Sequence, residues 1–148
     1  MSYNTVEEAN TYIDTHYLQT DKEYLYWSDL DDASKTVLLT RAFEKIERLP
    51  FVGRVYDVTQ TTCFPRYINQ SVVSVDTIKP AEVIEALSIG GAIPNQKPKG
   101  LKSFTIGHVS ETYSTSSSSS SDPLTAICDD AVRVLLSCLI GGYGICRY

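Results

Sequence analysis

Few residues of this chain have the types and spacing that catalysis requires. The two histidines, His16 and His108, are far apart, and neither lies near a Gly-x-Ser-x-Gly motif or a cysteine nucleophile motif. The chain also lacks a Walker A sequence, a Gly-x-Gly-x-x-Gly loop, a zinc-protease helix motif and a calcium loop. Glu82 and Glu85 stand three residues apart on an expected helix, and we interpret them as surface carboxylates without an acid–base role. The sequence therefore predicts a protein that is not an enzyme.

The four cysteines are not spaced as metal ligands. They are Cys63, Cys128, Cys138 and Cys146, and no two of them form a Cys-x-x-Cys pair. Because no histidine stands at ligand spacing from them either, we expect no zinc and no other cofactor. Cys128 and Cys138 fall on an expected helix, where cysteine behaves as a small buried hydrophobic residue. The first residues hold no signal sequence, which favours synthesis in a reducing cytoplasm.

Lys97, Lys99 and Lys102 form the only basic cluster, either a solubilising loop or a contact to a DNA backbone. The chain is acidic, with a net charge of −5 and a pI of about 4.9. Residues 1–49 hold ten Asp or Glu against five Lys or Arg. Because sequence-independent DNA binding depends on Lys and Arg, this charge disfavours broad nucleic-acid binding. Ten tyrosines could still stack on bases, so a single-stranded DNA-binding protein remains the alternative.

Apolar periodicity and capping signals predict four helices. The first covers residues 5–17 and begins at a capping box, and the second covers about 29–49 and ends at Pro50. The third begins at Pro80, and the fourth covers 123–140 with Asp122 as its cap. Residues 51–78 lack helical periodicity, and 101–113 favour a strand or a hairpin. Trp27 is interpreted as a core or interface anchor.

The predicted fold is therefore mainly α: a small bundle of about four helices with an extended arm at 101–121 and an extended C-terminal tail. A domain of residues 1–140 would carry the arm within an insertion at 96–121. The tail, residues 141–148, is aromatic and nearly uncharged, which suits addition to the sheet edge of a partner. Its predicted docking residues are Gly141, Gly142, Tyr143, Gly144, Ile145, Arg147 and Tyr148. No apolar run reaches the ~18–20 residues of a membrane-spanning helix.

Several short motifs follow one another along nearly the whole chain. They are residues 5–12, Trp27 followed by 38–42, 51–53, Gln60 with Phe64, Pro65 and Arg66, 78–83, and 106–107 with Tyr113. Their order and spacing resemble small head–tail connector proteins of tailed bacteriophages, some of which are labelled DnaT-like single-stranded DNA-binding proteins. By this resemblance, Trp27, Gln60, Phe64, Pro65 and Arg66 are structural motif residues.

The resemblance implies a structural protein of the virion neck, a head–tail adaptor that forms a ring, commonly of twelve copies, between the portal and the tail. Its expected partners are the portal protein, further copies of itself, a tail-side neck or tail-terminator protein, and the double-stranded DNA that passes through the bore. The C-terminal tail would dock on the portal, with Tyr143, Ile145 and Tyr148 as anchors. Acidic residues of the N-terminal half would line the bore, so that DNA slides through it. A neck stopper or tail-completion protein is a third interpretation, which the mostly helical pattern disfavours.

Overall fold

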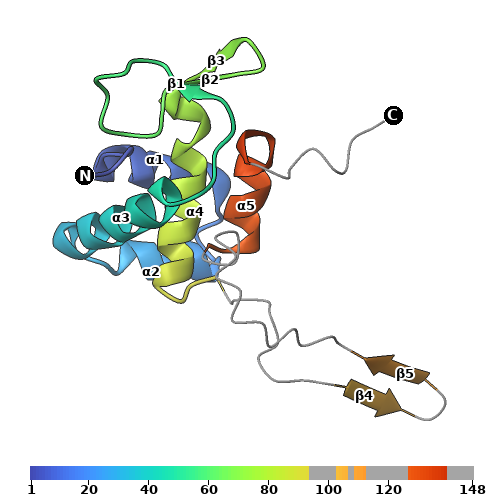
Figure 1. The fold of residues 1–148 in the computed structure, drawn as a ribbon. Helices are drawn as coiled ribbons and strands as arrows, with labels where there is room; N and C mark the ends of the chain where they lie inside the picture. The colour runs from blue at the N-terminus through green and yellow to red at the C-terminus, as the bar shows by residue number, and fades with distance from the viewer. Residues whose placement is uncertain (94–102, 107–108, 113–126, 140–148) are drawn as a thin grey trace.

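The structure is a computed structural model that describes residues 1–93, 103–106, 109–112 and 127–139, with only the backbone described for 103–106 and 109–112. Helices dominate it (Figure 1), which confirms the predicted mainly α fold. The α-helices are α1 (Val6–His16), α2 (Lys22–Ser28), α3 (Asp32–Glu47), α4 (Lys79–Ile89) and α5 (Asp129–Leu135).

The first predicted helix is confirmed to within one residue at each end. The Thr5 hydroxyl accepts a hydrogen bond from the Glu8 amide, and the Glu8 carboxylate accepts one from the Thr5 amide. This reciprocal capping box satisfies amides that have no partner within the helix. Ala9 and Ile13 form the buried side of α1.

Helix α2 was not predicted. It spans only two turns, and Trp27 is its one fully buried residue, at 2% exposure. A helix that buries a single residue leaves no apolar stripe at helical spacing for a sequence to reveal. The chain turns after it into α3, which buries Leu38, Ala42 and Ile46 along one side, as the second predicted helix requires.

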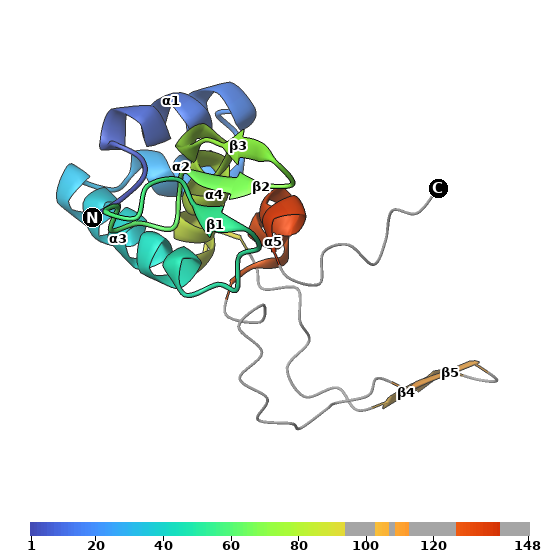
Figure 2. The same cartoon turned by 45° about the horizontal axis from the view of Figure 1, so that its top comes forward.

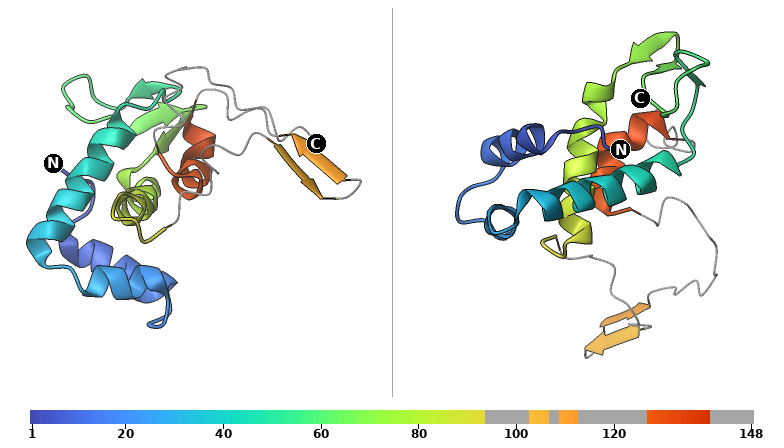
Figure 3. Two further views of the ribbon diagram at one scale, coloured as in Figure 1. Left: turned by 90° about the horizontal axis from the view of Figure 1, so that it is seen from below. Right: turned by 90° about the vertical axis from the view of Figure 1, so that its left-hand side faces the viewer.

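Helix α4 is the centre of the fold and packs against α1, α3 and α5 (Figure 3). The helix begins at Lys79, with Pro80 in its first turn, so the predicted start is confirmed. Every residue from 81 to 87 is buried, whereas apolar periodicity predicts burial along one side of a helix only. Two hydrophobic clusters meet on this helix: Ala81 and Ile84 belong to one, and Val83 and Leu87 to the other. A central helix of this kind must bury all its sides.

The fourth predicted helix starts later than expected. Helix α5 begins at Asp129 with Cys128 as its N-cap, so Ile127 precedes the helix; the predicted cap Asp122 lies outside the described residues. A 3₁₀ turn, Leu136–Cys138, follows α5, and Leu139 then forms an isolated bridge with Phe51. This bridge ties the end of the described chain to the segment that follows α3.

A small antiparallel sheet lies at one end of the helices (Figure 1), and Figure 2 turns that end toward the viewer. Its strands are in the order β1 (Arg54–Val55), β2 (Arg66–Ile68), β3 (Ser71–Val73). Gly53 precedes β1 with a φ of +78°, and a Cβ there would lie 1.9 Å from the Tyr67 carbonyl oxygen. Only glycine fits this conformation and this close approach. The 3₁₀ turn η1 (Val75–Thr77) leads from β3 into α4.

A second, two-stranded sheet pairs β4 (Ser103–Ile106) with β5 (Val109–Thr112), antiparallel. The pairing confirms a hairpin within the predicted arm.

Candidate assembly interface

The segment between β1 and β2 folds into a loop that its own side chains hold. Gln60 donates hydrogen bonds to the carbonyl oxygens of Thr62 (2.7 Å) and Pro65 (2.9 Å), and its side-chain oxygen accepts one from the Asp57 amide (3.0 Å). The Asp57 carboxylate accepts hydrogen bonds from the amide and the hydroxyl of Thr59, which hold the pKa of Asp57 below its ordinary value. These side-chain hydrogen bonds therefore favour one conformation of the loop.

Arg66 anchors this loop to the chain that leaves α3. Its guanidinium donates to the carbonyl oxygens of Phe51 (3.5 Å), Val52 (2.9 Å), Gly53 (3.1 Å) and Cys63 (3.3 Å). The Cζ atom of the Arg66 guanidinium also lies 5.8 Å from the ring centre of Phe51 and 5.9 Å from that of Phe64. A planar donor fork suits several carbonyls and two aromatic rings at once, which an ammonium group could not match.

The structure thus brings four of the sequence-predicted motif residues together. Gln60 and Arg66 hold the loop by hydrogen bonds, while Phe64 is 1% exposed and packs edge-to-face on Phe51. Pro65 follows Phe64 through a cis peptide bond. The fifth, Trp27, lies apart from them in the other hydrophobic cluster, where its indole N–H donates to the Asn10 side chain at 2.7 Å.

The tip of the loop presents apolar side chains to solvent. Val58 is 93% exposed and Tyr56 is 53% exposed. We call residues 56–60 the tip loop. Beside it, on β1 and β3, Val55 and Val72 are also exposed. A single exposed valine is common on protein surfaces, whereas several exposed apolar side chains side by side are typical of a surface that meets another protein.

The start of α3 and the end of α2 lie away from the three-stranded sheet (Figure 3), and the side chains there form a second apolar surface. Here an open depression of about 390 Å³ is lined by Tyr26, Leu30, Ala33, Ser34, Val37 and Leu38. We call it the α2–α3 depression. Val37 on its wall is 56% exposed, and Leu25 on α2 is 54% exposed.

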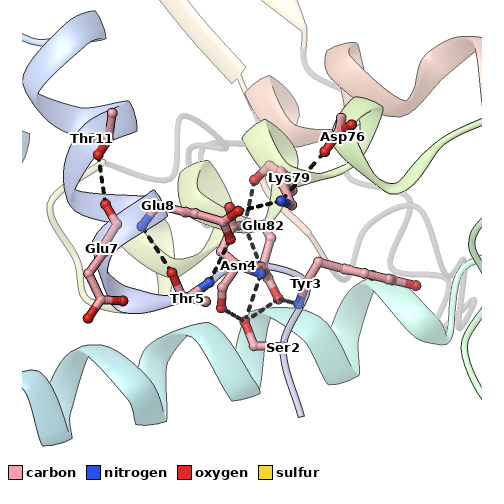
Figure 4. Close-up of polar contacts among 10 residues, drawn as sticks. All are labelled: Ser2, Tyr3, Asn4, Thr5, Glu7, Glu8, Thr11, Asp76, Lys79 and Glu82. Carbon is pink, nitrogen blue, oxygen red and sulfur yellow. Dashed lines mark hydrogen bonds and ion pairs between the residues drawn. The ribbon is translucent and has the colours of Figure 1, made fainter.

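Two buried carboxylates on α4 hold peripheral segments against the helices, and the prediction that they lie on the surface is wrong. Glu82 is fully buried, and Glu85 is 1% exposed. Glu82 binds the N-terminal segment (Figure 4): its oxygens accept hydrogen bonds from the Ser2 hydroxyl, the Tyr3 and Asn4 amides, and the Asn4 side chain. Burial raises the pKa of Glu82 above its ordinary value.

Glu85, and Glu47 at the end of α3, act in the same way on other segments. Glu85 accepts hydrogen bonds from the Lys45 ammonium group (2.8 Å) and from the Cys128 amide (2.7 Å), so it fixes the start of α5. Glu47 accepts from the Tyr3 hydroxyl and from the Cys63 amide. Burial, together with Glu47, raises the pKa of the Cys63 thiol to about 11. These three carboxylates hold the N-terminal segment, the start of α5 and the chain at Cys63 against the helices.

Sequence reasoning missed these carboxylates, although one signal could have found them. Glu82 and Glu85 stand in a stretch with apolar residues on every side, residues 81–87, which marks a central helix. Charged residues on such a helix are buried and therefore need partners. The tip loop and the α2–α3 depression carry no comparable signal.

The remaining predicted sites lie outside the described residues: Lys97, Lys99, Lys102 and the tail residues 141–148. Within the described part of the chain, no group of three or more His, Cys, Asp or Glu side chains could hold a metal ion. None of the described helices has the length and apolar character needed to cross a bilayer.

These features define a small, mainly helical protein with an apolar surface at each end of its longest described helix. A family model described as "putative DnaT-like ssDNA binding protein" matches residues 1–146. The chain belongs to this family. None of the curated proteins and none of the solved structures compared with the chain matches it.

Proposed function

We propose that this protein is a head–tail adaptor, a structural subunit that forms a ring between the portal and the tail of a bacteriophage. The observation that carries the proposal is the pair of exposed apolar surfaces at opposite ends of α3, the tip loop and the α2–α3 depression. Two different surfaces on one subunit allow head-to-tail contacts, and such contacts close into a ring when the rotation between subunits permits.

The part of the proposal that concerns portal docking is argued from the sequence. The aromatic tail, residues 141–148, would add to the portal by backbone hydrogen bonds and by burial of Tyr143, Ile145 and Tyr148. In this role the ring seals the neck and gives DNA a passage. The protein would be assembled in the host cytoplasm and reside in the virion neck.

The bore of the ring would be lined by carboxylates of the acidic N-terminal half. Glu7, Glu8 and Asp14 on α1 are exposed; Glu8 is paired with the Lys79 ammonium group at 2.6 Å, which leaves Glu7 and Asp14 as the main candidates for this role. Like charges keep DNA from adhering to the wall as it passes. A ring structure with these three side chains on the outer surface would contradict this part of the proposal.

Portal binding tests the proposal. The full chain and a variant that lacks residues 143–148 are each mixed with the portal protein of the same phage and recovered by affinity to the portal. We expect the full chain to bind and the truncated chain to stay folded, by circular dichroism, but unbound. Normal binding of the truncated chain would overturn the docking role of the tail. Failure of the full chain to bind would overturn the adaptor function.

A second function, binding of single-stranded DNA, is favoured by the description of the family and by one cluster on the sheet. The Arg54 guanidinium lies 5.2 Å from the ring centre of Tyr67, which stacks on Tyr56 at 5.3 Å. An exposed aromatic ring such as that of Tyr56 can stack on a base, and the arginine beside it can meet a phosphate. An oligonucleotide titration decides between the two functions: micromolar or tighter affinity at physiological salt, lost in Tyr56→Ala, would support DNA binding. The adaptor function predicts much weaker binding.

A further inference from the structure

The tip loop has the form of a preformed projection. Val58 at its apex is 93% exposed, while Asp57, Thr59 and Gln60 on either side are tied to one another by hydrogen bonds. Because these bonds fix the backbone, little conformational entropy remains to be lost when the loop binds. An exposed valine on a rigid loop is therefore suited to fill an apolar hollow.

The α2–α3 depression is an apolar hollow that could receive an apolar side chain such as that of Val58. Its lining is mainly apolar, from Tyr26, Leu30, Ala33, Val37 and Leu38, with Ser34 as the one hydroxyl contributed by α3. Val37 is more than half exposed although it faces this hollow. Covering it would remove apolar surface from water, which favours association.

The charges around the two surfaces are opposite in sign. Residues 48–73, which carry the tip loop, hold three arginines and one aspartate. Residues 21–38, which carry the depression, hold five acidic residues and two lysines, of which Lys35 is buried. The exposed side chains among them are Arg48, Arg54 and Asp57 at the first end, and Lys22, Asp29, Asp31 and Asp32 at the second. Opposite fields favour the approach of one end to the other and disfavour contact between like ends.

We infer that the partner of the α2–α3 depression is a second copy of this chain, whose tip loop seats Val58 in the hollow while Arg54 meets the acidic rim around Asp31. This contact is heterologous, because each subunit gives its loop to one neighbour and its depression to the other. The inference rests on the proposed ring and specifies the contact that builds it.

Two single variants test the contact, one on each of its two surfaces. Val58→Glu places a charge on the loop, and Val37→Glu places one on the wall of the depression. Both residues are exposed, so both variants should keep the wild-type fold and thermal midpoint. Each variant, with or without portal, should need a concentration more than roughly tenfold higher than wild type to assemble, since a charge is excluded from an apolar contact. Leu18→Glu, which adds the same charge at a residue that is 70% exposed elsewhere, is the matched control and should assemble normally.

Mixing the two variants gives the sharper test. Val58→Glu retains an intact depression, and Val37→Glu retains an intact loop, so one productive contact can form between them. Native mass spectrometry should show a 1:1 dimer that grows no further, while each variant alone stays monomeric. In addition, Arg54→Glu should impair assembly, and Asp31→Arg in the same chain should restore it in part.

The outcomes distinguish failure of this contact from failure of the proposed ring. If wild-type protein assembles and both valine variants assemble equally well, the contact is wrong and the ring stands. If the wild-type protein does not assemble even in the presence of the portal protein, the proposed adaptor function is overturned, and the inferred contact with it. If Val58→Glu and Val37→Glu leave assembly intact but Val58→Glu weakens oligonucleotide binding, the tip loop serves DNA and the contact is likewise overturned.

Discussion

Replacement of Arg66 by lysine should cost this small protein much of its stability, although both residues carry one positive charge. The guanidinium serves four carbonyl oxygens, at 2.9–3.5 Å, and lies against two phenylalanine rings. A lysine ammonium can reach one or two of these carbonyls and cannot form the planar fork. At least one carbonyl at the base of the loop is then left without a partner in a site where Arg66 is only 9% exposed.

The magnitude follows from these contacts. Loss of one or two charge-assisted hydrogen bonds costs about 1.5–3 kcal/mol each, and the weaker ring contacts add roughly 0.5–1 kcal/mol. Part of this is recovered because the smaller group leaves room for rearrangement. We therefore expect Arg66→Lys to lower the free energy of unfolding by about 3 kcal/mol, which in a domain of this size lowers the thermal midpoint by about 6–12 °C.

Urea unfolding followed by tryptophan fluorescence measures this effect, since Trp27 is the only tryptophan and is buried. Arg133→Lys is the matched control: Arg133 is 80% exposed and meets Asp130 at 3.5 Å on the surface, so its replacement should change stability by less than about 0.5 kcal/mol. If the two lysine variants are equally stable, Arg66 does not hold the loop in the way described.

Three further predictions concern single residues. Gly53→Ala should destabilise the protein by more than about 1 kcal/mol in urea unfolding, because of its positive φ and the Tyr67 carbonyl oxygen; unchanged stability would contradict this. With its thiol pKa at about 11 rather than 9.0, Cys63 should hold about 100-fold less thiolate near neutral pH. Peptide-resolved alkylation should therefore be slow at Cys63 and faster in Glu47→Gln; equal rates would refute the role of Glu47. For Glu82, the raised pKa means that the folded state keeps a proton which the unfolded chain has released. The stability of the wild type relative to Glu82→Gln should thus be greatest below pH 4.5, the ordinary pKa of glutamate. It should fall as the pH rises from there through the raised pKa. A stability difference that does not change with pH would contradict this prediction.

Local signals in the sequence were sufficient where an element is specified by its own residues. The capping box at Thr5 and Glu8 located α1, and Pro80 located the first turn of α4. Helix α2 was missed because one buried residue, Trp27, leaves no periodic pattern. The start of α5 was placed too early because Asp122 and Pro123 are strong capping signals, whereas the Cys128 amide is instead held by Glu85 from another helix.

The candidate interface depended on tertiary structure and could be predicted only in part. The sequence singled out the Gln60 to Arg66 motif, yet the exposure of Val58 emerges only when the loop is folded. The α2–α3 depression combines residues of two helices, one of them unpredicted. Glu82 was misinterpreted because spacing within one helix does not reveal which segments pack around it.

The mass of the complex formed with the portal protein tests the central claim most directly. Native mass spectrometry of the purified complex should give one discrete mass, equal to the portal ring plus a fixed number of copies of this chain. A chain that remains a monomer beside the portal, or that adds to it in variable numbers, would contradict the account.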